Sequence, residues 1–175
     1  MTTPPIQLQD NLSIRPARAN DQAFLTKLHH SSRDDLRLLD AEADFIEALI
    51  TLQQRAQNEG YGHDFPNALY FVVEKLGERI GRIVIDFGAQ EVRLIDILFI
   101  PAARGQGYGA SVIRSLQHAA AQVHTPLTLS AMHSSPQVLQ WYLNLGFKIV
   151  ATQATHSALT WYPPGLSPNH TAITH

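Results

Sequence analysis

The residues best suited to chemistry lie in a short glycine-rich segment between a predicted strand and a predicted helix. Three glycines alternate with other residues in this segment, which reads Arg104, Gly105, Gln106, Gly107, Tyr108 and Gly109. Glycine lets a backbone approach a phosphate closely because it has no Cβ. The first amide groups of a helix lack intrahelical partners and carry about half a positive charge. With the guanidinium of Arg104 beside them, these amides predict a binding site for a di- or triphosphate.

Two familiar phosphate-binding motifs do not fit this segment. A Walker loop needs Gly-Lys-Ser/Thr after its glycines, and the segment has none. The dinucleotide fingerprint needs the spacing G-x-G-x-x-G and an acidic residue about 20 positions later, and both are missing. A nucleotide-binding module of another kind stays an alternative. A glycine-rich turn without any ligand is disfavoured, because each idle glycine would cost about 0.5–1 kcal/mol.

The segment resembles the pyrophosphate loop of the GNAT superfamily, the acetyl-CoA-dependent N-acetyltransferases, whose pattern is Arg/Gln-x-x-Gly-x-Gly/Ala. A second match lies downstream, where a strand at 127–131 and a helix at 136–145 lead to Tyr142 and a closing Gly146-Phe147. Ser135 and Val138 depart from the family, which usually has Asn and Ala there. The resemblance covers residues 12–163 and is strongest from 92 to 147.

The resemblance implies an N-acetyltransferase that moves an acetyl group from acetyl-CoA to a primary amine of a small molecule, protein or peptide. It implies that the hydroxyl of Tyr142 is the general acid, although simple packing would also explain this tyrosine. A catalytically silent, acetyl-CoA-binding regulatory or assembly domain is the alternative. The cofactor-binding residues that the resemblance implies are Ile97, Phe99, Arg104, Gly105, Gln106, Gly107, Tyr108, Gly109, Ala110 and Ser135.

The general base is an open question in the sequence. Asp96 is the only carboxylate inside the predicted strand at 92–100, where a lone charge would be costly. A cross-strand ion pair with Arg82 is the more conservative interpretation of this residue, and an ordered water is an equally admissible base. Ser135 likewise has a plain interpretation, as an N-cap before a proline at the first helical position.

Acceptor recognition is expected from the first two predicted helices and the loop after them, where acidic residues would attract a cationic amine. Solvated charge, with the usual acidic enrichment of a first helical turn, is the more conservative interpretation of these residues. The acidic residues are Asp34, Asp35, Asp40, Glu42, Asp44 and Glu47, and Tyr61, His63 and Phe65 follow in a predicted loop.

Composition sets the broad class. A chain of 175 residues suits one domain, and the absence of cysteine excludes disulfides and thiolate metal sites. The net charge of −2 gives no reason to expect nucleic acid. The nine histidines show no ligand spacing, and no apolar run reaches membrane-spanning length, so we predict no metal, no membrane partner and a cytoplasmic location.

The order of predicted elements is strand, two helices, three strands, helix, strand, helix and two strands. This order predicts an α/β protein, and the resemblance implies the GNAT fold: a mixed, largely antiparallel sheet with helices on both faces and a central β-α-β acetyl-CoA site. We expect a flexible arm at 1–11, a single domain at 12–163 and a disordered tail at 164–175. The sheet edges would permit a homodimer.

Overall fold

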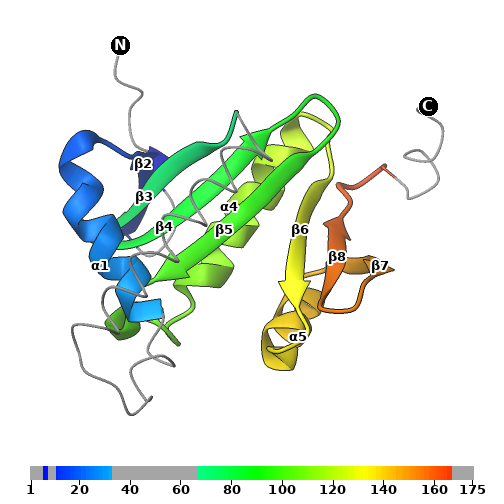
Figure 1. Ribbon diagram of the computed structural model, residues 1–175. Helices are drawn as coiled ribbons and strands as arrows, with labels where there is room; N and C mark the ends of the chain where they lie inside the picture. The colour runs from blue at the N-terminus through cyan, green and yellow to red at the C-terminus, as the bar shows by residue number, and fades with distance from the viewer. Residues whose placement is uncertain (1–5, 8–10, 33–66, 167–175) are drawn as a thin grey trace. The chain divides into compact units, whose positions relative to one another are not determined.

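The computed structural model describes residues 6–7, 11–32 and 67–166 (Figure 1). The chain divides into two compact units, one holding Met1–Val84 and Asp96–Tyr108, the other Ile85–Ile95 and Gly109–His175. The second predicted helix, the acidic residues and the loop with Tyr61 lie outside the described residues.

Antiparallel strands and one helix make up the described part of the first unit. Strand β2 pairs with both β1 and β3, with Ile14 opposite Ile6 on one side and Val73 on the other. Figure 1 shows α1 alongside these strands. The elements are β1 (Ile6–Gln7), β2 (Leu12–Pro16), the 3-10 helix η2 (Ala19–Asp21), α1 (Gln22–Ser32), β3 (Leu69–Lys75), most of β4 (Glu78–Phe87), the second half of β5 (Val92–Phe99) and the 3-10 helix η3 (Pro101–Ala103).

The core of the first unit follows from the pattern of branched residues. Strand β4 is buried continuously from Ile80 to Ile85, as expected for a strand covered on both faces. Leu12, Val72 and Val73 add fully buried side chains from β2 and β3. A tight turn at Leu76 and Gly77, both at positive φ, joins β3 to β4. Strand β4 starts directly after this turn. Near its start, the Ile80 carbonyl accepts a hydrogen bond at 2.9 Å from the amide of Ile100, the residue after β5.

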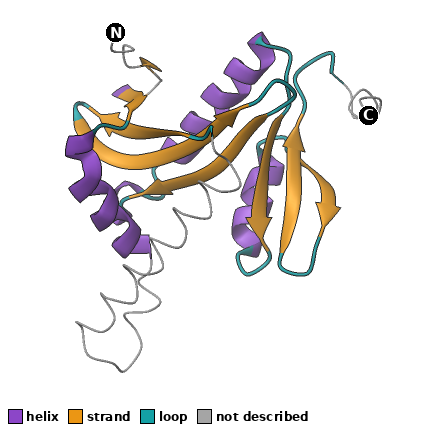
Figure 2. Ribbon diagram, turned by 45° about the horizontal axis from the view of Figure 1, so that its top comes forward, coloured by secondary structure: helices purple, strands orange, loops and turns teal. Residues whose placement is uncertain are grey.

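A β-α-β segment opens the second unit and a strand hairpin closes it. The parallel ladder between β5 and β6 consists of Val92 with Leu127 and Arg93 with Thr128. Strand β8 pairs antiparallel with both β6 and β7. Figures 1 and 2 both show α5 beside β6. The elements are α4 (Tyr108–Gln122), β6 (Leu127–Met132), α5 (Pro136–Asn144), β7 (Lys148–Thr152) and β8 (His156–Trp161).

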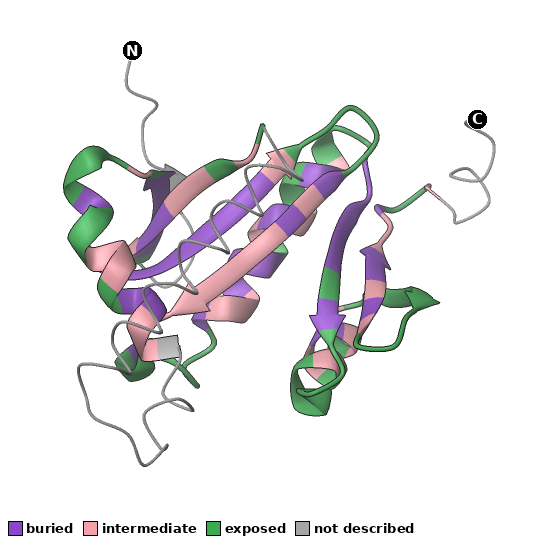
Figure 3. Cartoon of the chain, in the orientation of Figure 1, coloured by how far each residue is buried: buried purple, intermediate pink, exposed green. Residues whose placement is uncertain are grey.

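Burial in the second unit decreases toward the edge of its sheet. Leu127, Leu129 and Leu159 on β6 and β8 are fully buried, whereas every residue of β7 is exposed (Figure 3). Val112, Ile113 and Leu116 form the buried stripe of α4 at the spacing that the sequence predicted. Among the described helices, none is long and apolar enough to cross a membrane.

The predicted mixed, mostly antiparallel sheet is confirmed, with the strand order β1-β2-β3-β4-β5-β6-β8-β7. One local prediction needs correction, because Ile6–Gln7 within the predicted arm forms strand β1. A 3-10 turn that begins at Ala19 precedes the first helix, and the Asp21 carboxylate accepts the Arg18 amide there at 2.7 Å.

Candidate functional site

The predicted phosphate loop lies between η3 and α4, as the sequence indicated. Gly105 and Gly107 have φ values of 73° and 83°, in the left-handed region that favours glycine. Apart from each glycine and its two chain neighbours, no atom of the described residues lies within 4 Å of the position that a Cβ would take at either residue. Residues 104–107 are exposed, and the two glycines carry no side chain that would cover the backbone. This arrangement suits a ligand that binds through backbone amides.

Side chains of the loop bond to the backbone that precedes it, at the end of β5 and in η3. The Nε of Arg104 donates to the Phe99 carbonyl at 3.0 Å, and the Nε2 of Gln106 donates to the Ala102 carbonyl at 2.7 Å. The hydroxyl of buried Tyr108 donates to Oε1 of Gln106 at 3.2 Å and accepts a hydrogen bond from the ammonium of Lys75. Lys75 is a contact that the sequence did not reveal, since it comes from the end of β3.

Gly81 fixes how the end of β5 lies against β4. A Cβ at Gly81 would stand 2.7 Å from the Leu98 carbonyl oxygen and 2.8 Å from Cδ1 of Phe99. Contacts this short do not occur, so the ring of Phe99 lies where any other residue at 81 would place its side chain. Gly81 was not among the predicted site residues, and an isolated glycine inside a strand was the available signal.

Asp96 forms the predicted cross-strand ion pair with Arg82. The Nη2 of Arg82 donates to Oδ2 of Asp96, and the two side chains are 5% and 20% exposed. The Nε of Arg82 is buried and has no hydrogen-bond partner among the residues that the structure describes. The carboxylate therefore balances a buried cation, and its second oxygen is the atom left for other contacts.

In the second unit, Tyr142 lies in an aromatic cluster on α5. Its buried ring is 4.9 Å from the ring centroid of Trp141 and 5.6 Å from that of Phe147, both in edge-on geometry. Ser135 precedes the helix, with Pro136 at its first position, as the capping interpretation predicted. Its exposed hydroxyl makes no cap hydrogen bond.

The first unit brings together Asp96, Ile97, Phe99 and residues 104–108. Ile97 and Phe99 lie on β5 beyond Arg93, the last residue in the ladder with β6. Gly109, Ala110, Ser135 and Tyr142 belong to the second unit. In the described part of the chain, no cluster of His, Cys, Asp or Glu side chains could hold a metal ion.

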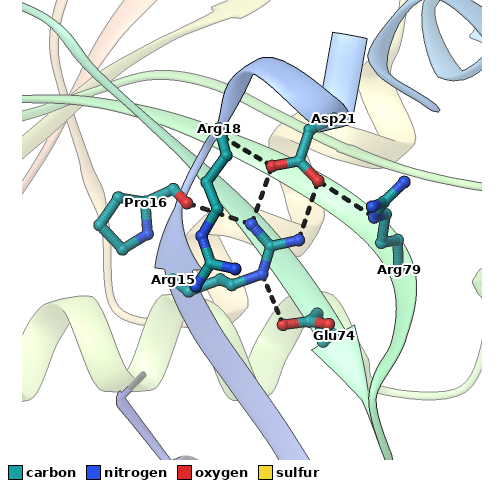
Figure 4. A network of polar contacts seen from close by, with 6 residues as sticks. All are labelled: Arg15, Pro16, Arg18, Asp21, Glu74 and Arg79. Atoms are coloured by element: carbon teal, nitrogen blue, oxygen red, sulfur yellow. Dashed lines mark hydrogen bonds and ion pairs between the residues drawn. The ribbon is translucent and has the colours of Figure 1, made fainter. Parts of the chain in front are cut away.

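A charged network that the sequence did not predict lies elsewhere in the first unit (Figure 4). Buried Asp21 accepts both Nη atoms of Arg15 at 2.8 Å and the Nε of Arg79 at 3.0 Å. The Nε of Arg15 donates to Glu74 at 2.7 Å. Hydrogen bonding by Arg15 lowers the pKa of Asp21 to about 2, against the opposing effect of burial, and the same pairing raises the pKa of Arg15. The network joins β2, β3 and β4 to η2, which is a structural role.

Comparison with known families assigns the glycine loop to a domain. Residues 66–149 match the acetyltransferase (GNAT) domain family, and this stretch contains the loop, Asp96 and Tyr142. The sequence matches no curated protein.

Solved structures with a similar fold are acetyltransferases of low sequence identity. The PaiA N-acetyltransferase from Thermoplasma acidophilum, in complex with coenzyme A, has a TM-score of 0.64 and 15% identity over 86% of this chain and 98% of its own. Spermidine N-acetyltransferase from Vibrio cholerae, in complex with CoA and spermine, has a TM-score of 0.61 and 16% identity over 87% and 95%. RimL, a ribosomal alpha-N-protein acetyltransferase in complex with coenzyme A, has a TM-score of 0.65 and 11% identity over 91% and 98%. At these identities the likeness shows the fold.

Domain match and fold agree on one kind of domain. Residues 66–149 match the acetyltransferase (GNAT) domain family, and the chain has the fold of the acetyltransferases named above.

Proposed function

We propose that the protein transfers an acetyl group from acetyl-CoA to a primary amine of a small molecule, protein or peptide. The observation that carries this proposal is the open backbone of the loop, with Gly105 and Gly107 in the left-handed region directly before α4. Amides at a helix N-terminus favour a diphosphate. Arg104 adds a guanidinium whose Nη atoms make no hydrogen bond or ion pair among the described residues.

The rest of the co-substrate would be held by backbone groups of four residues and by one side chain. Ile97 and Phe99 lie beyond the β6-paired part of β5, so their backbone groups suit an added strand-like partner such as the pantetheine arm. Ser135, with an exposed hydroxyl that caps nothing, is a secondary contact. Gly109 and Ala110 contribute amides in the first turn of α4.

Proton transfers set what the side chains must do. Bound acetyl-CoA supplies the activated acetyl thioester. The acceptor is mostly an ammonium at neutral pH, since alkyl amines have pKa values near 10.4, so a proton must leave before the nitrogen attacks the thioester carbonyl. As the C–S bond breaks, the Tyr142 hydroxyl donates its proton to the thiolate. A water molecule is the better candidate for the base, because Asp96 already balances Arg82.

The test is a screen for free-thiol release from acetyl-CoA. The acceptors are polyamines, amino acids, simple amines, and peptides with free N-termini or lysines. The wild-type protein should release thiol with at least one amine class, and mass spectrometry should show the acetylated amine. In Tyr142→Phe, turnover should fall by about 100-fold or more while acetyl-CoA still binds. Binding of acetyl-CoA without turnover on any amine would favour the catalytically silent domain. Unchanged turnover in Tyr142→Phe would show that Tyr142 is not the general acid.

A further inference from the structure

A chain of side-chain hydrogen bonds runs from the end of β3 into the glycine loop. The ammonium of Lys75 donates to the hydroxyl of Tyr108 and lies 4.6 Å from the centroid of the same ring. That hydroxyl donates to Oε1 of Gln106 at 3.2 Å, and Nε2 of Gln106 donates to the Ala102 carbonyl at 2.7 Å. These hydrogen bonds thus link three side chains in series, and the last one ends on the backbone of η3, directly before the loop.

These hydrogen bonds connect residues on either side of the two glycines in the left-handed region. Gly105 and Gly107 both lie between Ala102, which accepts the last hydrogen bond, and Tyr108, which accepts the first. Glycine residues lose the most conformational freedom when a loop becomes ordered. A loop that is already held in its binding conformation gives a ligand higher affinity, because the ordering free energy is not subtracted on binding.

Lys75 is suited to hold the loop because its own position is fixed. It is the last residue of β3, its backbone is paired with Leu12 of β2, and its side chain is half-buried. Tyr108 is buried and is the first residue of α4, so its side chain also has little freedom to move. Gln106, by contrast, is exposed and would be mobile without its hydrogen bonds to Tyr108 and Ala102.

We propose that Lys75 is a positioning residue for coenzyme A binding. Acting through Tyr108 and Gln106, it holds residues 102–108 in the conformation that receives the diphosphate. This inference rests on the proposed function.

The experiment measures the CoA dissociation constant by calorimetry for Lys75→Met, Tyr108→Phe and Gln106→Met. Each variant removes a link without inserting bulk, and each should weaken CoA binding by roughly three- to tenfold, the range for one lost hydrogen bond. The double variant Lys75→Met/Tyr108→Phe should bind no more weakly than the weaker single variant, because both break one chain. With an acetyl acceptor in hand, Lys75→Met should raise KM for acetyl-CoA and leave kcat unchanged.

Matched controls separate this effect from a general change in charge or stability. Lys148→Met, at an exposed lysine of β7, and Tyr162→Phe, after β8, should keep wild-type affinity. Lys75→Arg retains a cationic donor and should restore much of the affinity. In the ligand-free protein, amide hydrogen exchange at 104–109 should be faster in Tyr108→Phe than in the wild type.

Three results would overturn the proposal. Multiplicative losses in the double variant, or a loss in Lys75→Met with none in Tyr108→Phe, would show that Lys75 acts on the ligand directly. Unchanged CoA affinity and unchanged amide exchange in all three single variants would show that these hydrogen bonds do not hold the loop in its conformation. Failure of the wild type to bind CoA would instead count against the proposed function, and the exchange measurement would still test the hydrogen-bond chain.

Discussion

Arg82 and Asp96 form an ion pair between β4 and β5, in which the arginine is the more deeply buried partner. Their side chains are 5% and 20% exposed, and no other described carboxylate contacts Arg82. A buried guanidinium without its anion is strongly unfavourable, so Asp96 is needed for the folded state whatever else it does. This relationship favours a structural role for Asp96 over the role of general base.

Asp96→Asn should therefore lower the free energy of unfolding by about 3 kcal/mol, measured by urea denaturation, because it leaves Arg82 buried without a counter-charge. Turnover per folded molecule should change by less than about tenfold. The double variant Arg82→Met/Asp96→Leu should recover much of the stability, since it removes both charges. Wild-type stability in Asp96→Asn, combined with a loss of turnover of about 100-fold or more, would show that Asp96 is the base.

Stability at acid pH should depend on Asp21. Its pKa is lowered to about 2 in the folded protein from an ordinary value of 3.8, so the folded state binds a proton less readily than the unfolded chain. The stabilisation is complete above about pH 4 and is lost as the pH falls from about 4 to 2, and it amounts to about 2 kcal/mol.

Urea denaturation between pH 7 and pH 2 tests this linkage. Asp21→Asn should be less stable than the wild type at pH 7 and should lose less stability on acidification. Glu91→Gln removes a carboxylate from an exposed turn residue and should keep the wild-type profile. If Asp21→Asn retained the full acid-induced loss, the network around Arg15 would not be its source.

The β3–β4 turn should be improved by Leu76→Asn. Leu76 has φ 51°, is 75% exposed and precedes Gly77 at φ 84°, which is the backbone of a two-residue hairpin turn that favours Asn-Gly. The substitution should raise the free energy of unfolding by about 0.5–1 kcal/mol, visible as a higher Tm. Leu76→Ala removes the same apolar exposure without the preference of Asn for positive φ, and it should give no gain. An equal gain in the free energy of unfolding in both variants would show that the effect comes from removing the exposed leucine side chain.

Gly81→Ala should destabilise the protein by about 1–3 kcal/mol, because its Cβ would collide with the Leu98 carbonyl. Adding Phe99→Leu should not restore stability, since that change relieves the contact with the ring and leaves the contact with the backbone. The stabilities of the single and double variants are compared by thermal unfolding. Full recovery in the double variant would mean that the Phe99 ring alone requires glycine at 81.

Local patterns predicted the elements of the described chain because strand alternation, helical spacing and turn residues act over a few positions. The glycine loop, α4 and the placement of Tyr142 on α5 follow from such patterns, and the Arg82–Asp96 pair followed from adjacent strands. The arginine network and the contact of Lys75 with Tyr108 did not, because they join residues 59 and 33 positions apart. Strand β1 was missed because its two residues are too few to form a pattern. The homodimer, the cytoplasmic location and the acidic acceptor surface stay predictions.

The central claim is that the loop before α4 binds the diphosphate of acetyl-CoA through its backbone. Its most direct test is the calorimetric titration of acetyl-CoA into the wild type, Gly107→Glu and Gly165→Glu. The two glycines have φ values of 83° and 87° and equal free space, so both substitutions introduce the same backbone strain and charge. We predict that the wild type and Gly165→Glu bind alike and that Gly107→Glu shows no binding. Wild-type affinity in a folded Gly107→Glu variant would contradict the account.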